Sequence, residues 1–298
     1  MAVIRKKMKK ALRIGTRDSE LALWQAKKVQ TLLENFGYTT SLVPVKSQGD
    51  LSLDIPLYEM GITGVFTKVL DVAMLQGSID IAVHSMKDVP TSLPKGIVKG
   101  AVLTRANVQD VLVYKDGLDF LSQEQATIAT GSLRRKAQWL RRYPTHQVEN
   151  LRGNIATRLH KLHEHSWHGA IFAAAALERL AQDHLQRLSL EWMTPAPAQG
   201  AIMVLAHEDN VDLQGILLKI HDGKTYIETQ VERAFLRALE GGCTAPIGAY
   251  AEFDGEQVHF KGGLWSEDGK QEALVNETFD HIDEFTGEWL ASKIRDNY

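Results

Sequence analysis

The chain has 298 residues, 44% of them hydrophobic, and a net charge of −3, which suits two or three globular domains with separate cores. This balance gives no reason to expect nucleic-acid binding. No apolar run approaches the roughly 20 residues of a membrane-spanning helix, so no membrane partner is expected. The single cysteine, and the absence of a signal-peptide apolar segment after the basic residues Arg5 to Lys10, predict a cytoplasmic protein.

The first hundred residues alternate between short apolar strands and amphipathic helices. The patterns predict strands at 12–15, 38–45 and 79–83, and helices at 19–36 and 66–76. Such alternation is typical of a parallel sheet with helices on its faces. His84 follows the third strand, and we interpret it as a structural histidine whose hydrogen bonds are satisfied.

A second alternating unit begins near Asp110. Strands are predicted at 111–114, 127–129, 147–151 and 169–172, with helices that begin at the caps Ser132 and Asn154 and a further helix at 173–180. The segment 194–200 contains two prolines and predicts a connection between domains. The apolar strand 201–206 is expected to return to the first sheet.

The last third has a different pattern. Thr225 and Glu228 form a capping box that would open a helix. An Asp254-Gly255 turn between strands 249–253 and 257–264 predicts a hairpin, followed by one more strand and a helix near 282–294. We therefore expect two α/β domains and a small α+β domain, divided as 1–104 with 200–219, 105–199, and 220–298.

Cations gather in the second unit. Between residues 132 and 161 the one acid is Glu149, whereas the cations are Arg134, Arg135, Lys136, Arg141, Arg142, Arg152, Arg158 and Lys161. Arginine is suited to bidentate recognition of carboxylate or phosphate, which predicts an anionic partner. For Arg141 and Arg142, a solvated helix end where cations complement the helix dipole remains an alternative.

Three loops at strand ends carry the candidate chemistry, because ligands of α/β sheets bind there. The first contains Arg17 and Ser19, although Ser19 is also a good helix cap. The second contains Lys87 and Asp88, where Asp88 is either a working carboxylate or a turn residue. The third combines glycines, hydroxyls and arginines at two helix starts, namely Thr130, Ser132, Arg134, Arg135, Arg152 and Arg158.

Cys243 is the only cysteine and lies in the run LEGGCTAPIG. A lone cysteine is often a small buried hydrophobe. Here a helix is expected to end at Gly241, and the adjacent glycines allow close approach to the sulfur, so the thiol could anchor a group covalently.

Five segments, in order, resemble the hydroxymethylbilane synthase (porphobilinogen deaminase) family: IGTRDSELALWQA, IDIAVHSMKDVP, ATGSLRRKAQ, LRGNIATRL and LEGGCTAPIGAYAE. The resemblance covers nearly the whole chain. It implies two periplasmic-binding-protein-like domains around a cleft, plus a small C-terminal domain. It further implies a transferase that joins four porphobilinogen units, with loss of ammonia, into hydroxymethylbilane for haem biosynthesis.

The resemblance also assigns residues. It implies a dipyrromethane cofactor bonded to Cys243, the catalytic carboxylate at Asp88, and no metal. The residues implied to bind the carboxylates of substrate and cofactor are Arg17, Ser19, Lys87, Thr130, Ser132, Arg134, Arg135, Arg152, Arg158 and Arg179. We expect a monomer. The alternative from another class is a two-lobed module that binds an anion without catalysis.

The chain departs from the family pattern in two places. Glu59 and Thr63 stand where many members have lysines, which puts in doubt how that loop contacts the growing product. Pro197 and Ala198 replace residues of the family's PAVGQG segment, a change expected to stiffen the connection between domains.

Overall fold

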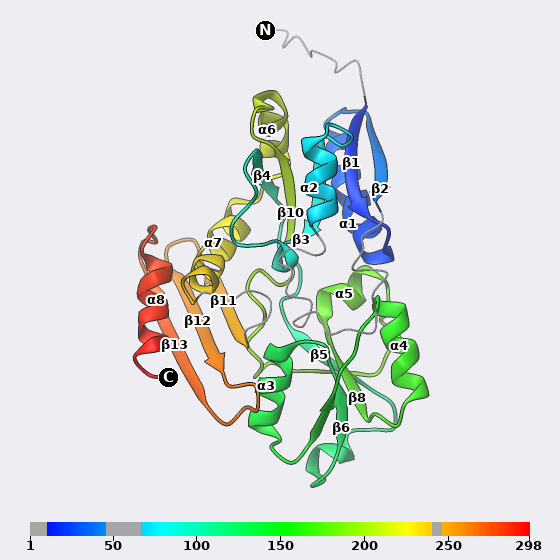
Figure 1. Cartoon of the computed structure of the whole chain (residues 1–298), viewed down its shortest axis with the longest axis vertical. Helices are drawn as coiled ribbons and strands as arrows, with labels where there is room; N and C mark the ends of the chain where they lie inside the picture. Colours follow the sequence, from blue (N-terminus) through cyan, green and yellow to red (C-terminus); the bar gives the residue numbers. More distant parts are fainter. Residues whose placement is uncertain (1–10, 46–66, 240–245) are drawn as a thin grey trace.

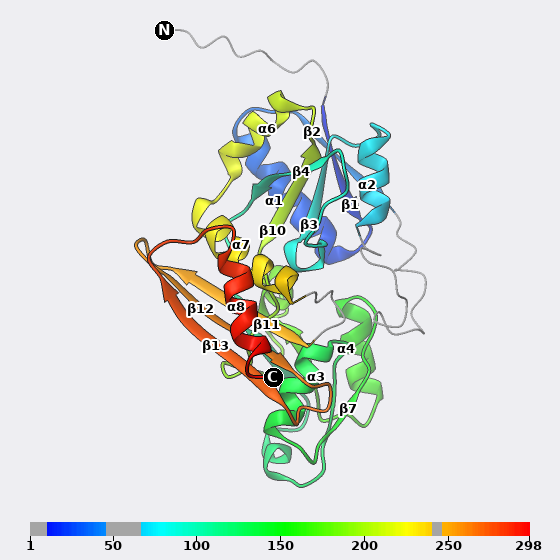
Figure 2. The ribbon, with the colours of Figure 1, turned by 60° about the vertical axis from the view of Figure 1, so that its left-hand side comes forward.

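The computed structural model describes residues 11–45, 67–239 and 246–298. Figure 1 shows two α/β domains at opposite ends of the long axis, with a smaller sheet and two helices beside them. Turned by 60°, Figure 2 shows α8 lying across the small sheet. The expected fold class, two α/β domains and a small α+β domain, is confirmed.

The first sheet has the strand order β2-β1-β3-β10-β4. Its strands are β1 (Leu12–Arg17), β2 (Thr40–Val45), β3 (Ile81–Ser85), β4 (Ile97–Val102) and β10 (Ile202–His207). Its helices are α1 (Glu20–Asn35), α2 (Lys68–Leu75) and α6 (Val211–Leu217). Helix α1 packs on the face that carries Ile81 and Val83, whereas α2 packs on the face that carries Ala82. The alternation of side chains along β3 therefore joins two cores.

The second sheet has the order β7-β6-β8-β5-β9. Its strands are β5 (Asp110–Tyr114), β6 (Thr127–Ala129), β7 (Gln147–Glu149), β8 (Gly169–Ala173) and β9 (Arg187–Ser189). Its helices are α3 (Leu133–Arg142), α4 (Ile155–Glu164) and α5 (Ala174–Arg179). Trp139 of α3 is fully buried on one face, and Leu162 of α4 on the other.

The expectation of a parallel first sheet is correct only in part. Strand β1 is parallel to β2 and β3, but β10 is antiparallel to both β3 and β4. In the second sheet β5 is likewise antiparallel to β8 and β9. The physical reason is chain direction, since β5 and β10 are the strands with which the chain enters each domain from the other. The predicted return of 201–206 to the first sheet is confirmed.

The third domain holds a sheet in the order β11-β12-β13 and two helices. The elements are α7 (Gly223–Ala238), β11 (Ile247–Phe253), β12 (Val258–Trp265), β13 (Glu272–Phe279) and α8 (Thr286–Arg295). The predicted hairpin is confirmed, because the Asp254 carboxylate accepts hydrogen bonds from the amides of Glu256 and Gln257.

The predicted capping box is wrong. Asp222 caps α7 instead, and its carboxylate accepts a hydrogen bond from the Thr225 amide. The Thr225 hydroxyl accepts a hydrogen bond from the Arg105 amide, and the Glu228 carboxylate accepts one from the Phe253 amide. Both side chains are therefore used in contacts between distant segments, which outweigh the local pattern.

Both connections between the α/β domains meet the third domain at one buried ion pair. Arg105 in the first connection donates to both carboxylate oxygens of Glu232 on α7, at 2.8 and 2.9 Å. Glu232 is fully buried and also accepts from the amides of Ala198, in the second connection, and Ala251, in β11. Ala198 has a φ of 61°, a left-handed conformation that costs a non-glycine residue roughly 1–2 kcal/mol.

Candidate active site

The loop after β3 presents Lys87 and Asp88. A short 3-10 turn, Met86–Asp88, follows the strand directly, and its Met86 is buried in the core. The Met86 amide donates to the Ala201 carbonyl at the start of β10. Because the methionine fixes this turn on the sheet, Lys87 and Asp88 lie half-buried at the strand end.

Two helix starts lie side by side in the second domain. Ser132 caps α3 and Asn154 caps α4, each accepting from a backbone amide three residues on, as predicted. Gly131 packs so closely on the Leu151 carbonyl that a Cβ would lie 2.5 Å from it. Glycine is required for that approach, and it brings Thr130 and Ser132 next to the segment that carries Arg152.

Arg134 and Arg135 share a carboxylate that the sequence did not single out. Asp110 is fully buried and forms ion pairs with Arg134 Nη1 at 2.8 Å and Arg135 Nη2 at 2.7 Å. Arg134 also donates to the Thr194 carbonyl, and Arg135 to the Ile171 carbonyl. Burial alone would raise the pKa of Asp110, but the two guanidinium groups outweigh it and hold this pKa well below its usual value.

Arg152 and Arg158 have no such carboxylate within the described part of the chain. Arg152 is 7% exposed, and its Nη1 is buried without a hydrogen-bond partner among the described residues. Arg158 donates from Nε to the Gly153 carbonyl. Burial lowers the pKa of Arg152, and burial together with Arg135 and Arg152 lowers the pKa of Arg158 to about 10. Neither arginine therefore forms an ion pair with a carboxylate of the described residues, and Arg152 keeps an unused donor.

The loop after β3 faces this charge. Burial lowers the pKa of Lys87 to about 8, with Arg135 and Arg134 acting in the same direction and Asp88 opposing them. The Asp88 charge also acts on Arg158, whose pKa it raises against the other contributions. Residues from both α/β domains are thus within electrostatic reach of one another: Lys87, Asp88, Arg134, Arg135, Arg152 and Arg158.

Arg17 and Ser19 lie on the neighbouring strand end. Ser19 caps α1 through its hydroxyl, which accepts from the Ala22 amide, and Arg17 ends β1. Strand β1 is parallel to β3, so Arg17 and the start of the Lys87 turn lie at the same edge of the sheet.

The interpretation of His84 as a satisfied histidine is wrong. His84 is 5% exposed, and its Nε2 is buried without a hydrogen-bond partner in the described ranges. Burial and the nearby Arg17 charge lower its pKa to about 4, so the ring is neutral at pH 7. The ring lies on the α2 side of β3, where the described core residues are apolar, and these offer Nε2 no hydrogen-bond partner.

Arg179 lies at the junction of the two α/β domains. It donates to the Gly200 carbonyl at 2.6 Å, and its guanidinium lies over the ring of Trp24 of α1, 5.6 Å from the ring centre. Burial lowers its pKa to about 10. Arg141 and Arg142 point elsewhere: Arg141 binds the Lys270 carbonyl and Glu272 of the third domain, whereas Arg142 lies over the Trp192 ring.

Cys243, Glu59 and Thr63 lie outside the described residues. Within them, sequence reasoning missed the importance of Asp110 and Gln199. The signals in the sequence were Asp110 at the start of the apolar strand DVLVY and Gln199 as the one glutamine in a connection of small and apolar residues. Neither signal predicts which residues these side chains contact, because those residues lie far along the chain.

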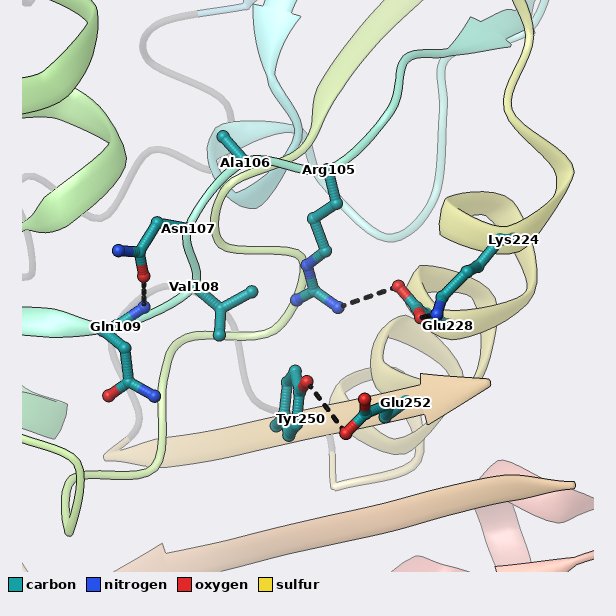
Figure 3. A pocket seen from close by; sticks show the side chains of 9 residues that line it. All are labelled: Arg105, Ala106, Asn107, Val108, Gln109, Lys224, Glu228, Tyr250 and Glu252. Atoms are coloured by element: carbon teal, nitrogen blue, oxygen red, sulfur yellow. Dashed lines mark hydrogen bonds and ion pairs between the residues drawn. The ribbon is translucent and has the colours of Figure 1, made fainter. Parts of the chain in front are cut away.

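A pocket of about 380 Å³ lies apart from these residues, between the first connection and the third domain. Figure 3 shows Arg105 pointing toward Glu228 of α7, with Lys224 beside that carboxylate and Tyr250 next to Glu252. Its lining includes none of the residues that the sequence assigned to substrate binding. The pocket therefore marks the junction of the domains rather than the candidate active site.

No helix among the described residues is both long and apolar enough to cross a membrane. In residues 11–45, 67–239 and 246–298, no three His, Cys, Asp or Glu side chains are grouped so that they could hold a metal ion.

Two family models match the chain. The model described as "Porphobilinogen deaminase, dipyromethane cofactor binding domain" matches residues 12–215, and "Porphobilinogen deaminase, C-terminal domain" matches residues 226–294. A porphobilinogen deaminase of Syntrophotalea carbinolica is 42% identical over 273 residues, which cover 90% of this chain and 86% of that protein. A probable porphobilinogen deaminase of Methanocaldococcus jannaschii is 43% identical over 82% of this chain and 83% of its own.

Solved structures with similar architecture are more distant in sequence. The VFT2 domain of Bordetella pertussis BvgS gives a TM-score of 0.44 at 13% identity, covering 74% of this chain and 90% of that domain. An ancestral cationic amino acid solute-binding protein gives 0.45 at 14% identity, covering 70% of this chain and 86% of its own.

Proposed function

This chain belongs to the porphobilinogen deaminase family, and from that premise we propose that it joins four porphobilinogen units into hydroxymethylbilane, releasing ammonia at each addition. The observation that supports this proposal is the buried Arg152 Nη1, which has no hydrogen-bond partner in the described part of the chain and lies near Arg158, within whose electrostatic reach Asp88 lies. Each porphobilinogen unit carries an acetate and a propionate, so a growing chain of such units needs several buried cations.

The residues present fit the dipyrromethane cofactor that the first family model names. Arg152 Nη1 is a buried donor with no acceptor in the described part of the chain, and a carboxylate would satisfy it. We propose that Arg152, Arg158 and Lys87 hold the carboxylates of this cofactor and that Cys243 carries it. When bound, the cofactor supplies the free end to which porphobilinogen units are added.

For Asp88 we propose the role of the catalytic carboxylate. Loss of ammonia leaves the incoming substrate electron-poor, and positive charge develops near the reacting carbon. A carboxylate at Asp88 stabilises that charge, and its oxygen atoms can take up and return the proton of a pyrrole N–H. Lys87 and Arg158 lie within electrostatic reach of this carboxylate.

The other assignments remain proposals of the same kind. We propose that Arg17, Ser19, Thr130, Ser132, Arg134, Arg135 and Arg179 support substrate and cofactor binding. For Arg134 and Arg135 the contribution is partly indirect, since Asp110 already pairs with both. We also propose a monomer, a cytoplasmic location and the domain division 1–104 with 200–219, 105–199, and 220–298.

The proposed covalent attachment of the cofactor to Cys243 is tested by mass spectrometry. Denaturing mass spectrometry of the purified chain should give the polypeptide mass plus two pyrrole units, and peptide mapping should locate them on Cys243. An unmodified Cys243 in enzyme that consumes porphobilinogen would contradict the assignment.

The catalytic part is tested by Asp88→Asn, which removes the charge and keeps the size. Porphobilinogen consumption should fall on the order of 10²- to 10³-fold, while the thermal midpoint stays near that of the parent. If Asp88 only formed a turn, asparagine would replace it almost without loss, because both side chains form the same turn. Near-normal turnover would therefore remove Asp88 from the mechanism.

A further inference from the structure

Gln199 lies in the second connection between the α/β domains and is fully buried. Its Nε2 donates to the Val108 carbonyl at 2.7 Å and to Asp110 Oδ1 at 3.0 Å. Its Oε1 accepts from Lys87 Nζ at 3.1 Å. One side chain thus contacts the loop after β3, the first connection and the first strand of the second domain.

The direction of this amide is determined by its partners. A carbonyl and a carboxylate can only accept hydrogen bonds, so the amide nitrogen must face Val108 and Asp110. An ammonium group can only donate, so the amide oxygen must face Lys87. Rotating the amide by half a turn would lose all three bonds, each inside the protein, where an unmade bond is costly.

The Lys87 ammonium group lies among charged side chains, so its orientation decides which of them it can contact. Arg134, Arg135 and Asp110 are near enough to act on its charge, and so is Asp88, its neighbour in the turn. The Gln199 oxygen is neutral, so it orients the ammonium group without neutralising it. A carboxylate at the same position would orient Lys87 as well, but it would compete with an anionic ligand for the charge.

We infer that Gln199 is a positioning residue that aims Lys87 at the bound carboxylates and makes that aim depend on how the two α/β domains are arranged. The inference rests on the proposed role of Lys87 in binding carboxylates. Since Val108 and Asp110 hold the other end of the amide, a rotation of the second domain against the first would shift Gln199 and, through it, the ammonium group of Lys87.

The test measures Lys87 itself and does not need activity. Trace acetylation with acetic anhydride over a pH series, followed by peptide mass spectrometry, gives the titration midpoint of Lys87, with the exposed Lys224 as reference in the same sample. In Gln199→Met this midpoint should fall further below about 8, because the ammonium form loses an acceptor. In Gln199→Glu it should rise instead, because the new carboxylate favours the charged form.

Gln138→Met is the matched control. Gln138 is also a buried amide that binds the second connection, through the amide and carbonyl of Thr194, but it does not contact Lys87. A loss of packing alone would therefore appear in this variant too, whereas the Lys87 midpoint should not move. If Gln199→Glu fails to fold, comparing the Lys87 midpoint in Gln199→Met and Gln138→Met still tests whether Gln199 orients Lys87.

Kinetics complete the test. For Gln199→Met we expect KM for porphobilinogen to rise about tenfold, with a smaller change in kcat. An unchanged Lys87 midpoint in folded Gln199→Met would overturn the positioning role, whatever the activity. A shifted midpoint with unchanged KM would instead overturn carboxylate binding by Lys87, which is part of the proposed function.

Discussion

Two sets of buried arginines in this protein differ in one respect. Arg105, Arg134 and Arg135 each pair with a buried carboxylate, either Glu232 or Asp110. Arg152 is buried and Arg158 half-buried, yet in the described part of the chain neither forms an ion pair. The ion pairs of Arg105, Arg134 and Arg135 hold connections and strands together. Burying Arg152 and Arg158 without an ion pair costs folding free energy, and binding an anionic ligand would recover that cost.

The largest effect is expected where one partner of a fully buried ion pair is removed. Arg105→Met leaves the Glu232 carboxylate buried without its cation, and removing one partner of a buried pair costs about 3–5 kcal/mol. Urea unfolding should show a decrease of that size in the free energy of unfolding. Lys293→Met breaks a half-exposed pair with Glu277 and should cost less than about 1 kcal/mol. Equal losses would remove the distinction between buried and surface pairs.

Arg152→Leu, in contrast to Arg105→Met, should lower activity without lowering the free energy of unfolding. Truncating one partner of a desolvated charged contact costs roughly 2–5 kcal/mol, so turnover or cofactor assembly should fall on the order of 30-fold or more. The free energy of unfolding of the chain without cofactor should stay the same or increase, because an unpaired buried cation is lost.

Arg142→Leu is the control for this change, since Arg142 is exposed and packs on aromatic rings at the end of α3. Its turnover should remain close to that of the parent. Similar turnover in the Arg152→Leu and Arg142→Leu variants would show that Arg152 does not bind the carboxylates of substrate or cofactor.

His84 provides a smaller effect that depends on pH. Its folded pKa of about 4 lies below the ordinary 6.5, so below pH 6.5 the unfolded chain binds the proton first. The stability contributed by the neutral ring is therefore complete above pH 6.5 and is lost as the pH falls toward 4, by roughly 3 kcal/mol. In His84→Leu the free energy of unfolding should fall less between pH 7 and 4.5.

The control for that measurement is His259→Leu. His259 is about half exposed on the hairpin of the third domain, next to Asp254. This variant should keep the steep acid dependence of the parent. If both variants lost it to the same extent, His84 would not be its source.

Local signals in the sequence were reliable where the partner is also local. The caps at Ser19, Ser132 and Asn154 were predicted because each hydroxyl or amide binds a backbone group three residues away. The capping box at Thr225 failed because Arg105 and Phe253, far along the chain, take its two side chains. For the same reason the sequence located the arginines but could not separate those paired with Asp110 from Arg152 and Arg158, which form no ion pair among the described residues.

The place of β10 has a consequence for synthesis of the chain. This strand lies between β3 and β4, and in the described sheet β4 pairs with no other strand. While residues up to about 200 are being made, the first domain therefore lacks the strand that joins β4 to the rest. The second domain already has all five of its described strands by Ser189. Although domains generally fold from the N-terminus onward during synthesis, this arrangement favours completion of the second domain before the first.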